Sequence, residues 1–386
     1  MLRRMVPAVC AGLALAVAAT LPAAAATSTN TNAVSFQKLA QFGVPGSLSF
    51  DGSTFGGLSG INYDSATGTW RAISDDSSDH GPARFYYLSL GSTANGLNTA
   101  LAQDTASPAT VAAGVVPLQR ADGTYYPPSA TAGQDTVHPE GIAYDPTTGN
   151  VFWADEGANN TLLAIDPTVR EAGTDGSYVA TLPVSGALHS TGTSGIRDGE
   201  GLSGVAFSSN GQVAVSTVAG PLLQDGPNPT ATTGGYARIV LQNRLLGFRP
   251  LAQYAYPLDA LPLTDANGNG TNEIADILPV DTTHYLVLEH GTAAGKGNSV
   301  RLYEIDTTNA TNVTTLTSLA GATFTPVSKT LLVDFATLHL GNVANFSGLT
   351  WGPTLPNGEK TLVLVSDNNF DSHTSTQFLA LAVSGL

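Results

Sequence analysis

The sequence predicts an all-β fold, and more specifically a β-propeller, on three observations. A five-residue motif of Ser or Glu, Gly, an aliphatic residue, any residue and an aromatic occurs at 59–63, 140–144, 203–207 and 347–351. Each copy is followed by a polar turn and then by a second apolar strand, as at 151–153. Helical periodicity is scarce, and 42 Gly and 22 Pro suit many short strands and turns. Repeats of this kind predict blades that are each one antiparallel sheet.

The repeat is clearest at 138–156, where an inner strand, a tight turn and a second strand end on Asp155 and Glu156. A looser fifth copy runs from Ala275 to Glu289. Five copies are visible, and we expect six blades if the strands near 34–36 and 378–383 close the ring. Long stretches of small and polar residues, such as 91–134, are expected to be insertions between strands.

The N-terminus has the features of a secretory signal peptide. A basic start is followed by an apolar run from Val6 to Leu21 and by small residues up to Ala26. We therefore predict a signal peptide at 1–26, a polar linker at 27–33 and one propeller domain at 34–386, in a secreted protein. Cys10 is the single cysteine and lies in the signal segment, so no disulfide is expected.

The charge balance excludes some partners. The formal net charge is −15, and binding to nucleic acid or anionic lipid needs clustered Lys and Arg. No later apolar run approaches membrane-spanning length. We expect a monomer that acts on a small-molecule ester or phosphoester, with no nucleic-acid partner and no membrane span.

Several motifs together resemble the bacterial phytase-like domain family, also called "esterase-like activity of phytase". They lie at 57–61, 138–142, 198–202, 286–289, 345–349, 366–370 and 376–377. The resemblance covers nearly all of the chain after residue 36, and it implies a secreted β-propeller with phosphoester or ester hydrolase activity. Two positions differ from the family pattern: Ser347 stands where Glu is expected, and His290 stands where Arg commonly follows Glu.

Acidic and amide side chains recur at equivalent positions of the repeat. In a propeller the inner strands line a central channel, so residues at their starts are expected to converge. Converging carboxylates repel unless they are protonated or bridged by a cation, and Ca²⁺ prefers oxygen ligands. The alternative is that these acids cap turns. The expected metal ligands of this kind are Glu140, Glu200, Glu273 and Asn345, together with Asp155 and Asp367 from the ends of second strands, where Asp75, Asp76, Glu156 and Glu289 also lie.

A second calcium candidate is the loop 265–276. It matches a calcium-loop pattern with oxygen ligands at Asp265, Asn267 and Asn269, Gly270 at the sixth position and Asp276 at the twelfth. The flanking sequence is not helical, so this would be an isolated calcium loop. The alternative is a plain Asn-Gly loop between strands.

The remaining candidates are assigned by chemistry. His138 lies two residues from Glu140, and single basic residues could hold an anionic substrate. Arg71 is a further candidate cation. The expected catalytic residues are His138, Glu140, Glu200 and Glu289, and the expected substrate-binding residues are His290, Lys296, Arg301, Asn368 and Asn369.

A serine hydrolase is disfavoured, because 57–60 and 201–204 do not complete Gly-x-Ser-x-Gly and lie in strand repeats. The sequence therefore favours a calcium-dependent phosphoesterase in which the metal activates water and a Glu or Asp acts as general base. Two alternatives remain open. One is a binding propeller with structural calcium, and the other is a lactonase or carboxylester hydrolase.

Overall fold

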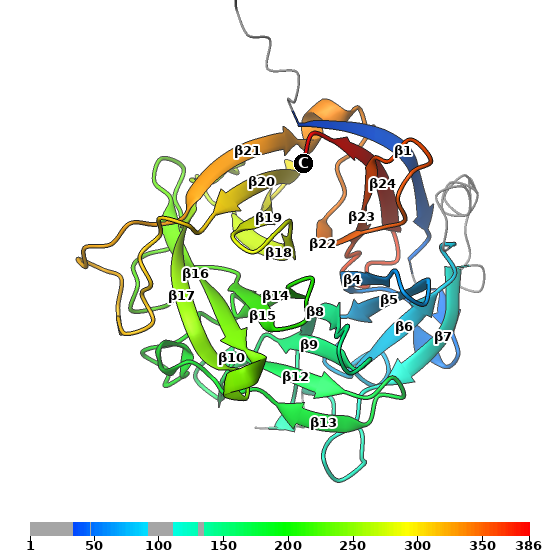
Figure 1. Cartoon of the computed structure of the whole chain (residues 1–386), viewed down its shortest axis with the longest axis horizontal. Coiled ribbons are helices and arrows are strands. Elements are labelled where there is room, and N and C mark those ends of the chain that lie inside the picture. Colours follow the sequence, from blue (N-terminus) through cyan, green and yellow to red (C-terminus); the bar gives the residue numbers. More distant parts are fainter. Residues whose placement is uncertain (1–33, 47, 92–110, 130–134) are drawn as a thin grey trace, which may run out of the picture. The chain divides into compact units, whose positions relative to one another are not determined.

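Five four-stranded antiparallel sheets surround a central axis as the blades of a propeller (Figure 1). This computed structural model describes residues 34–46, 48–91, 111–129 and 135–386. The predicted signal peptide at 1–26 and linker at 27–33 lie outside the described residues. In the described part, no helix is long and apolar enough to cross a membrane. The prediction of an all-β propeller is confirmed.

The first three blades follow one another along the chain, each from its inner strand outward. Blade 1 contains β4 (Leu58–Asp64), β5 (Thr69–Ser74), β6 (Arg84–Leu88) and β7 (Ala112–Pro117). Blade 2 contains β8 (Pro139–Tyr144), β9 (Val151–Asp155), β12 (Thr168–Ala172) and β13 (Tyr178–Thr181). Blade 3 contains β14 (Leu202–Phe207), β15 (Val213–Val218), β16 (Gly235–Asn243) and β17 (Arg249–Leu258).

The last two blades complete the ring. Blade 4 contains β18 (Glu273–Pro279), β19 (His284–Ala293), β20 (Gly297–Asp306) and β21 (Ser328–Asp334). Blade 5 contains β22 (Phe346–Trp351), β23 (Lys360–Ser366), β24 (Thr376–Ser384) and β1 (Ser35–Val44). Two hairpins lie outside the blades, β2 (Ser49–Phe50) with β3 (Ser53–Thr54) and β10 (Ala158–Asn159) with β11 (Ala164–Ile165). Short 3₁₀ turns are η2 (Gly186–Leu188), η3 (Arg244–Leu246) and η4 (Phe335–Leu338).

The described blades number five, where the sequence led us to expect six. The expected sixth blade rested on the N-terminal and C-terminal strands. These strands, β1 and β24, instead pair with each other and join the blade of the last repeat copy. Phe42 of β1 stacks on Phe378 of β24 with ring centroids 5.0 Å apart. The two ends of the chain therefore close the ring within one sheet.

The glycine of the repeat motif is explained by the narrow axis. A Cβ on Gly141 would lie 2.8 Å from the carbonyl oxygen of Ser203 in the next inner strand. A Cβ on Gly60 would likewise meet the carbonyl oxygen of Glu140, and one on Gly348 would meet the Cα of Gly60. Because the obstructing atoms are backbone, the inner strands can approach this closely only where no side chain intervenes.

In blade 4 this position is Asp276 instead of glycine. Its carboxylate accepts hydrogen bonds from the backbone N–H groups of Ile277 and of Leu349 in β22, the latter at 2.9 Å. Gly204 of the preceding blade leaves room for it, since a Cβ there would lie 2.7 Å from Oδ1 of Asp276. Asp276 thus links two inner strands.

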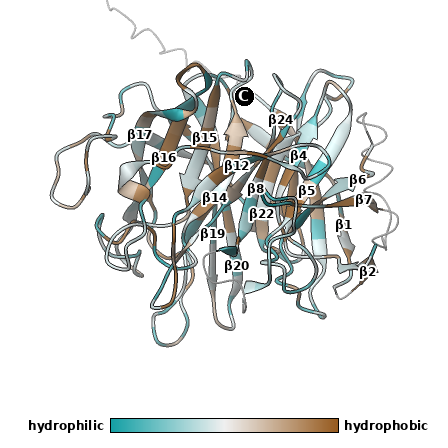
Figure 2. Cartoon of the chain, turned by 90° about the horizontal axis from the view of Figure 1, so that it is seen from below, coloured by the Kyte–Doolittle hydropathy of each residue, from teal (hydrophilic) through white to brown (hydrophobic). Residues whose placement is uncertain are grey.

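Separate hydrophobic clusters lie at the junctions between neighbouring blades. Trp70 and Phe378 belong to the cluster between blades 1 and 5, and Phe152 and Val218 to the one between blades 2 and 3. The side view in Figure 2 shows hydrophobic stretches along the strands. Burial of both faces of each blade in this way holds the inner strands rigidly around the axis.

Candidate functional site

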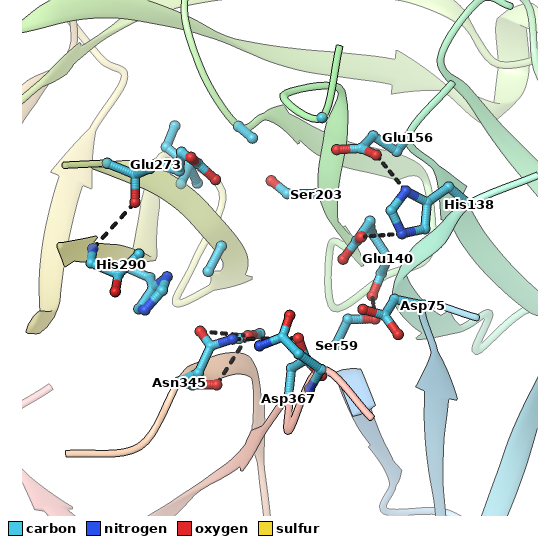
Figure 3. A pocket seen from close by; sticks show the side chains of 18 of the residues that line it. Ser59, Asp75, His138, Glu140, Glu156, Ser203, Glu273, His290, Asn345 and Asp367 are labelled. Carbon is cyan, nitrogen blue, oxygen red and sulfur yellow. Dashed lines mark hydrogen bonds and ion pairs between the residues drawn. The ribbon is translucent and has the colours of Figure 1, made fainter. Parts of the chain in front are cut away.

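A polar pocket of about 390 Å³ occupies one end of the propeller axis (Figure 3). In an antiparallel pair the start of one strand lies beside the end of the next. The pocket is accordingly lined by the starts of inner strands and the ends of second strands, as the sequence predicts. Its side chains include Ser59, Asp75, His138, Glu140, Glu156, Ser203, Glu273, His290, Asn298, Asn345, Ser347, Asp367 and Asn369.

In every blade, the pairing between the inner strand and its neighbour shifts register near the start of the inner strand. The residues at these irregularities are Ser59, Glu140, Ser203, Ala275 and Ser347. All five line the pocket. A bulge redirects one side chain out of the normal alternation, and here it directs one from each blade toward the axis.

Asp75, His138 and Glu140 form the candidate metal site. Each offers one ligand atom, and these atoms lie within 4.8 Å of one another. Asp75 follows the end of β5, His138 precedes β8 and Glu140 lies within β8. Blades 1 and 2 therefore both contribute to the group, and Figure 3 shows its side chains on one side of the pocket.

Glu156 and Asp155 hold His138 in place. Nδ1 of His138 lies 2.5 Å from Oε2 of Glu156, and its Nε2 lies 3.5 Å from Oε1 of Glu140. Oδ1 of Asp155 accepts the backbone N–H of His138 at 3.0 Å, and Oδ2 pairs with Arg170 at 2.8 Å. Burial opposes protonation of His138, but the hydrogen bond and charge of Glu156 outweigh it and raise the His138 pKa well above its ordinary value.

The carboxylates of the pocket are difficult to ionise together. Burial, followed by the charge of Asp367, raises the pKa of Asp75 well above its ordinary value. Burial also raises the pKa of Glu140, with Glu156 and Asp75 adding to the effect and His138 opposing it. Burial raises the pKa of Asp367 to about 6, against the backbone N–H of Asn369 and the charge of His138.

The chemistry of this group fits a divalent cation. Oδ1 of Asp75 is buried and has no hydrogen-bond partner within the described residues. A histidine whose second nitrogen is hydrogen-bonded to a carboxylate, as His138 is to Glu156, is the usual arrangement of a metal-binding imidazole. A cation would also relieve the repulsion between Asp75 and Glu140. Two carboxylates and one imidazole thus form a candidate metal site.

Glu273 and His290 lie across the pocket from this group (Figure 3). Burial, with the charges of Glu200 and Glu156, raises the pKa of Glu273 to about 8. Burial lowers the pKa of His290, whose Nε2 lies 3.1 Å from Oδ1 of Asn298. This side therefore presents a protonated carboxylic acid and a neutral imidazole near pH 7.

The turn after β23 brings Asp367 and Asn369 to the pocket. Asn369 and Phe370 both adopt left-handed backbone conformations, with φ of 49° and 53°. The side chain of Asn368 holds the turn, because its Oδ1 accepts the N–H of Gly57 at 2.9 Å and its Nδ2 donates to Thr374. Strained backbone of this kind persists only where the surrounding structure holds it.

The structure brings many, but not all, of the expected site residues together. Those that line the pocket are His138, Glu140, Glu273, His290, Asn345, Asp367 and Asn369. Asp155 and Asn368 lie directly behind its wall and hold its residues in place. Glu200 is outside the lining, where it accepts a hydrogen bond from Asn228.

Three residues expected to act on substrate are not among those that line the axial pocket. Glu289 is buried in blade 4, where it contacts Lys329, Tyr256 and Asn272. Arg301 pairs with Asp334 at 3.1 Å on the outer part of the same blade. Lys296 is exposed in the turn between β19 and β20. The further candidate Arg71 is buried, with its guanidinium over the rings of Tyr87 and Tyr144.

The calcium pattern at 265–276 does not form one coordination loop. Oδ1 of Asp265 accepts the backbone N–H groups of Asn267 and Asn269, at 2.8 and 2.9 Å, in an exposed turn. Asp276, expected as the last ligand, is buried and directs both oxygens to backbone N–H groups. The first and twelfth positions therefore serve a turn and a strand junction, as in the alternative of a plain loop.

Several pocket residues were not singled out as site residues from the sequence. Ser59 and Ser203 stand out in the sequence only as repeat positions, and Ser347 only as a repeat position that differs from the family pattern, although each occupies the same place as Glu140. Their signal was the motif itself, since the residue before the glycine recurs in each copy. Thr271, Thr292 and Asn298 had no such signal.

Comparisons with known proteins identify the family of the chain. A family model described as "Phytase-like: Esterase-like activity of phytase" matches residues 53–370. Solved structures that match the chain include the Dos1 propeller (6% identity, 84% of this chain and 68% of that chain, TM-score 0.33). Two others are a member of the DUF4221 family from Bacteroides vulgatus (8%, 91% and 99%, 0.39) and a protein of unknown function from Dyadobacter fermentans (9%, 89% and 86%, 0.40). No curated protein matches the chain.

Proposed function

Because the chain belongs to the phytase-like family, whose description is esterase-like activity of phytase, we propose that it is a metal-dependent hydrolase of ester bonds. The observation that carries the proposal is the grouping of Asp75, His138 and Glu140 within the axial pocket. We further propose that the protein is secreted, in line with the signal peptide that the sequence predicts at 1–26.

Asp75, His138 and Glu140 would hold the cation, with Glu156 fixing the orientation of the imidazole. When bound, a divalent cation lowers the pKa of water and polarises an ester oxygen. Ca²⁺ is the ion that the sequence predicts, and Asn345 offers a further oxygen atom in the same pocket. The ring nitrogen of His138 also suits Mn²⁺ or Zn²⁺, so the experiment includes all three ions.

Two other carboxyl groups have pKa values on opposite sides of neutrality. The pKa of Asp367 is about 6, so this group is mostly ionised at pH 7 and can accept a proton from the attacking water. The pKa of Glu273 is about 8, so this group is mostly protonated and can donate a proton to the leaving oxygen. Environments that separate two carboxyl pKa values in this way assign the base and the acid.

The side chains that line the axial pocket favour a substrate with little negative charge. None of the described lining residues is Lys or Arg, and the nearby Arg170 is paired with Asp155. A polyphosphate such as phytate would therefore meet several carboxylates with little compensating charge. A neutral carboxylic ester or a phosphoester whose charge the cation screens fits the pocket better.

The experiment follows hydrolysis of p-nitrophenyl phosphate, bis(p-nitrophenyl) phosphate and p-nitrophenyl acetate. The metal-stripped protein is assayed alone and after addition of Ca²⁺, Mn²⁺ or Zn²⁺. We expect activity on at least one ester to require a cation and to fall at least 100-fold in Glu140→Gln.

The control is Glu171→Gln, because Glu171 lies in the same blade and contacts Asn150 away from the pocket. It should retain wild-type activity. Absence of hydrolysis of all three esters under every metal condition would overturn the proposal and favour a binding propeller.

A further inference from the structure

A second pocket of about 270 Å³ opens beside the axial pocket. The two share His138, Glu156 and Gly199 as a common wall. The imidazole of the candidate metal site therefore borders both spaces. A substrate that lies beside this imidazole can extend into the second pocket, which we call the side pocket.

The side pocket differs chemically from the axial one. Val137, Ala158, Leu163 and Ile165 contribute apolar side chains to its wall. It also has three acids, Asp155, Glu156 and Asp198, but each already has a partner in the protein. Asp155 pairs with Arg170, Glu156 with His138, and Asp198 accepts the N–H of Asn159 at 3.1 Å. The walls therefore offer an apolar ligand group a surface without requiring a cation.

The outer wall is a hairpin held firmly in place. β10 and β11 pair Ala158 with Ile165. Gly157 allows the chain to turn directly after Glu156, with φ of 79° and no space for a Cβ against the backbone of Ile165. Such close approach requires glycine.

Asn159 ties this hairpin to the connection between β13 and β14. Its Nδ2 donates to the carbonyl oxygens of Ser194 and Ile196 at 3.0 and 2.7 Å. Its Oδ1 accepts the N–H of Gly192 at 2.7 Å. Because this side chain is buried and fully bonded, the side pocket is formed before any ligand enters.

We propose that the side pocket binds the acyl chain of a carboxylic ester whose carbonyl carbon lies at the shared wall. The alcohol portion then lies in the axial pocket, among its hydroxyl, amide and carboxyl groups. This inference rests on the proposed ester hydrolase and specifies its substrate as an ester with an apolar acyl chain of several carbons.

The reaction is a hydrolysis and needs no other reactant. Water adds to the carbonyl carbon as Asp367 takes its proton, and the bond from that carbon to the alcohol oxygen breaks. Glu273 gives its proton to the departing alcohol. The products are one carboxylic acid and one alcohol, and solvent returns the protons to the two side chains.

The test is a series of p-nitrophenyl esters from acetate to octanoate, with the metal-loaded protein. Each added methylene that enters an apolar pocket should raise kcat/KM by roughly threefold to fourfold. We expect this rise over the first few methylenes, followed by a plateau when the pocket is filled.

Two variants reduce the side pocket without touching the metal site. Ala158→Phe should remove the dependence on chain length and leave acetate hydrolysis unchanged, and the smaller Ala158→Leu should shorten the range of the rise. The control is Leu162→Phe, because Leu162 is 87% exposed at the tip of the same hairpin. It should behave as the wild type, and melting curves check that each variant folds.

The outcomes separate this inference from the proposed function. A wild-type rate that is flat with chain length, or a rise that survives Ala158→Phe, overturns the side-pocket assignment while the hydrolase stands. If the wild type hydrolyses no ester, the function fails, and calorimetric titration with hexanamide tests the pocket alone. Binding that Ala158→Phe abolishes supports an apolar subsite, and absent or unchanged binding overturns it.

Discussion

Nδ1 of His138 lies 2.5 Å from Oε2 of Glu156, so the imidazole presents its other nitrogen toward Glu140. This pair joins the residue before β8 to the residue after β9. It gives the candidate metal site a fixed imidazole, which Asp155 supports from behind through the backbone N–H of His138.

Glu156→Gln should weaken cation binding by roughly 10- to 100-fold, because the amide accepts the Nδ1–H of the imidazole less strongly and fixes the ring less well than the carboxylate does. Calorimetric titration of the metal-free protein measures this change. Glu171→Gln is the control in the same blade and should bind as the wild type. Equal affinity in Glu156→Gln would show that this pair does not orient a ligand.

The pH dependence of kcat/KM should be bell-shaped. Activity should rise through about pH 6 as Asp367 ionises and fall above about pH 8 as Glu273 loses its proton. Glu273→Gln should lower activity on alkyl esters and remove the alkaline limb, while p-nitrophenyl esters, whose leaving group needs no proton, should be affected less. An unchanged alkaline limb in Glu273→Gln would exclude Glu273 as the proton donor.

The same residue should make stability depend on pH. Because the folded pKa of Glu273 is about 8 and its ordinary value is 4.5, the folded state binds more protons than the unfolded state between these values. Its contribution to the free energy of unfolding is full below about pH 4.5 and is lost as the pH rises to about 8. Melting curves should show that the stability of Glu273→Gln, relative to that of the wild type, increases from pH 5 to pH 8. A constant difference would contradict the raised pKa.

Gly141→Ala should lower the free energy of unfolding by about 1–3 kcal/mol, because its Cβ would lie 2.8 Å from backbone atoms of β14. Chemical denaturation measures the change. Gly186→Ala is the matched control, since a Cβ there meets no atom within 4 Å. A similar effect from both substitutions would mean that close packing at the axis does not require the glycine.

Lys329→Met should cost roughly 3–5 kcal/mol in stability, because it leaves the buried Glu289 without its cation. The metal affinity of the protein should stay unchanged, since neither residue lines the axial pocket. Lys296→Met, at an exposed turn position, is the control and should alter neither quantity. A loss of cation binding in Lys329→Met would restore Glu289 to the functional site.

The repeat motif was enough to predict the propeller and the place where its acids converge. Glu140, Glu273 and Asn345 line one pocket at the axis because they lie at or next to the starts of inner strands, a position that the repeat makes visible. The five visible copies match the five described blades, and the expectation of a sixth came from assigning a separate blade to the terminal strands, whereas β1 and β24 both complete the sheet of β22.

The sequence alone does not distinguish the acids that line the pocket from the acids that have structural partners. Glu289 and Asp155 lie within or at the end of second strands as expected, yet their side chains pair with Lys329 and Arg170, which are 40 and 15 residues away in sequence. The spacing of Asp276 predicts a calcium ligand, but the residue takes the place of the axial glycine in its blade and binds backbone N–H groups. These assignments depend on contacts between strands, within a blade for Glu289 and Asp155 and between blades for Asp276, which local patterns do not encode.

The most direct test of the account is calorimetric titration of the metal-stripped protein with Ca²⁺, Mn²⁺ and Zn²⁺, comparing the wild type with Asp75→Asn. Asp75 contributes the buried oxygen that has no partner in the described structure. We predict that one equivalent of at least one ion binds the wild type and binds Asp75→Asn at least 10-fold more weakly. Binding of no ion, or equal binding to both proteins, would contradict a metal site at Asp75, His138 and Glu140.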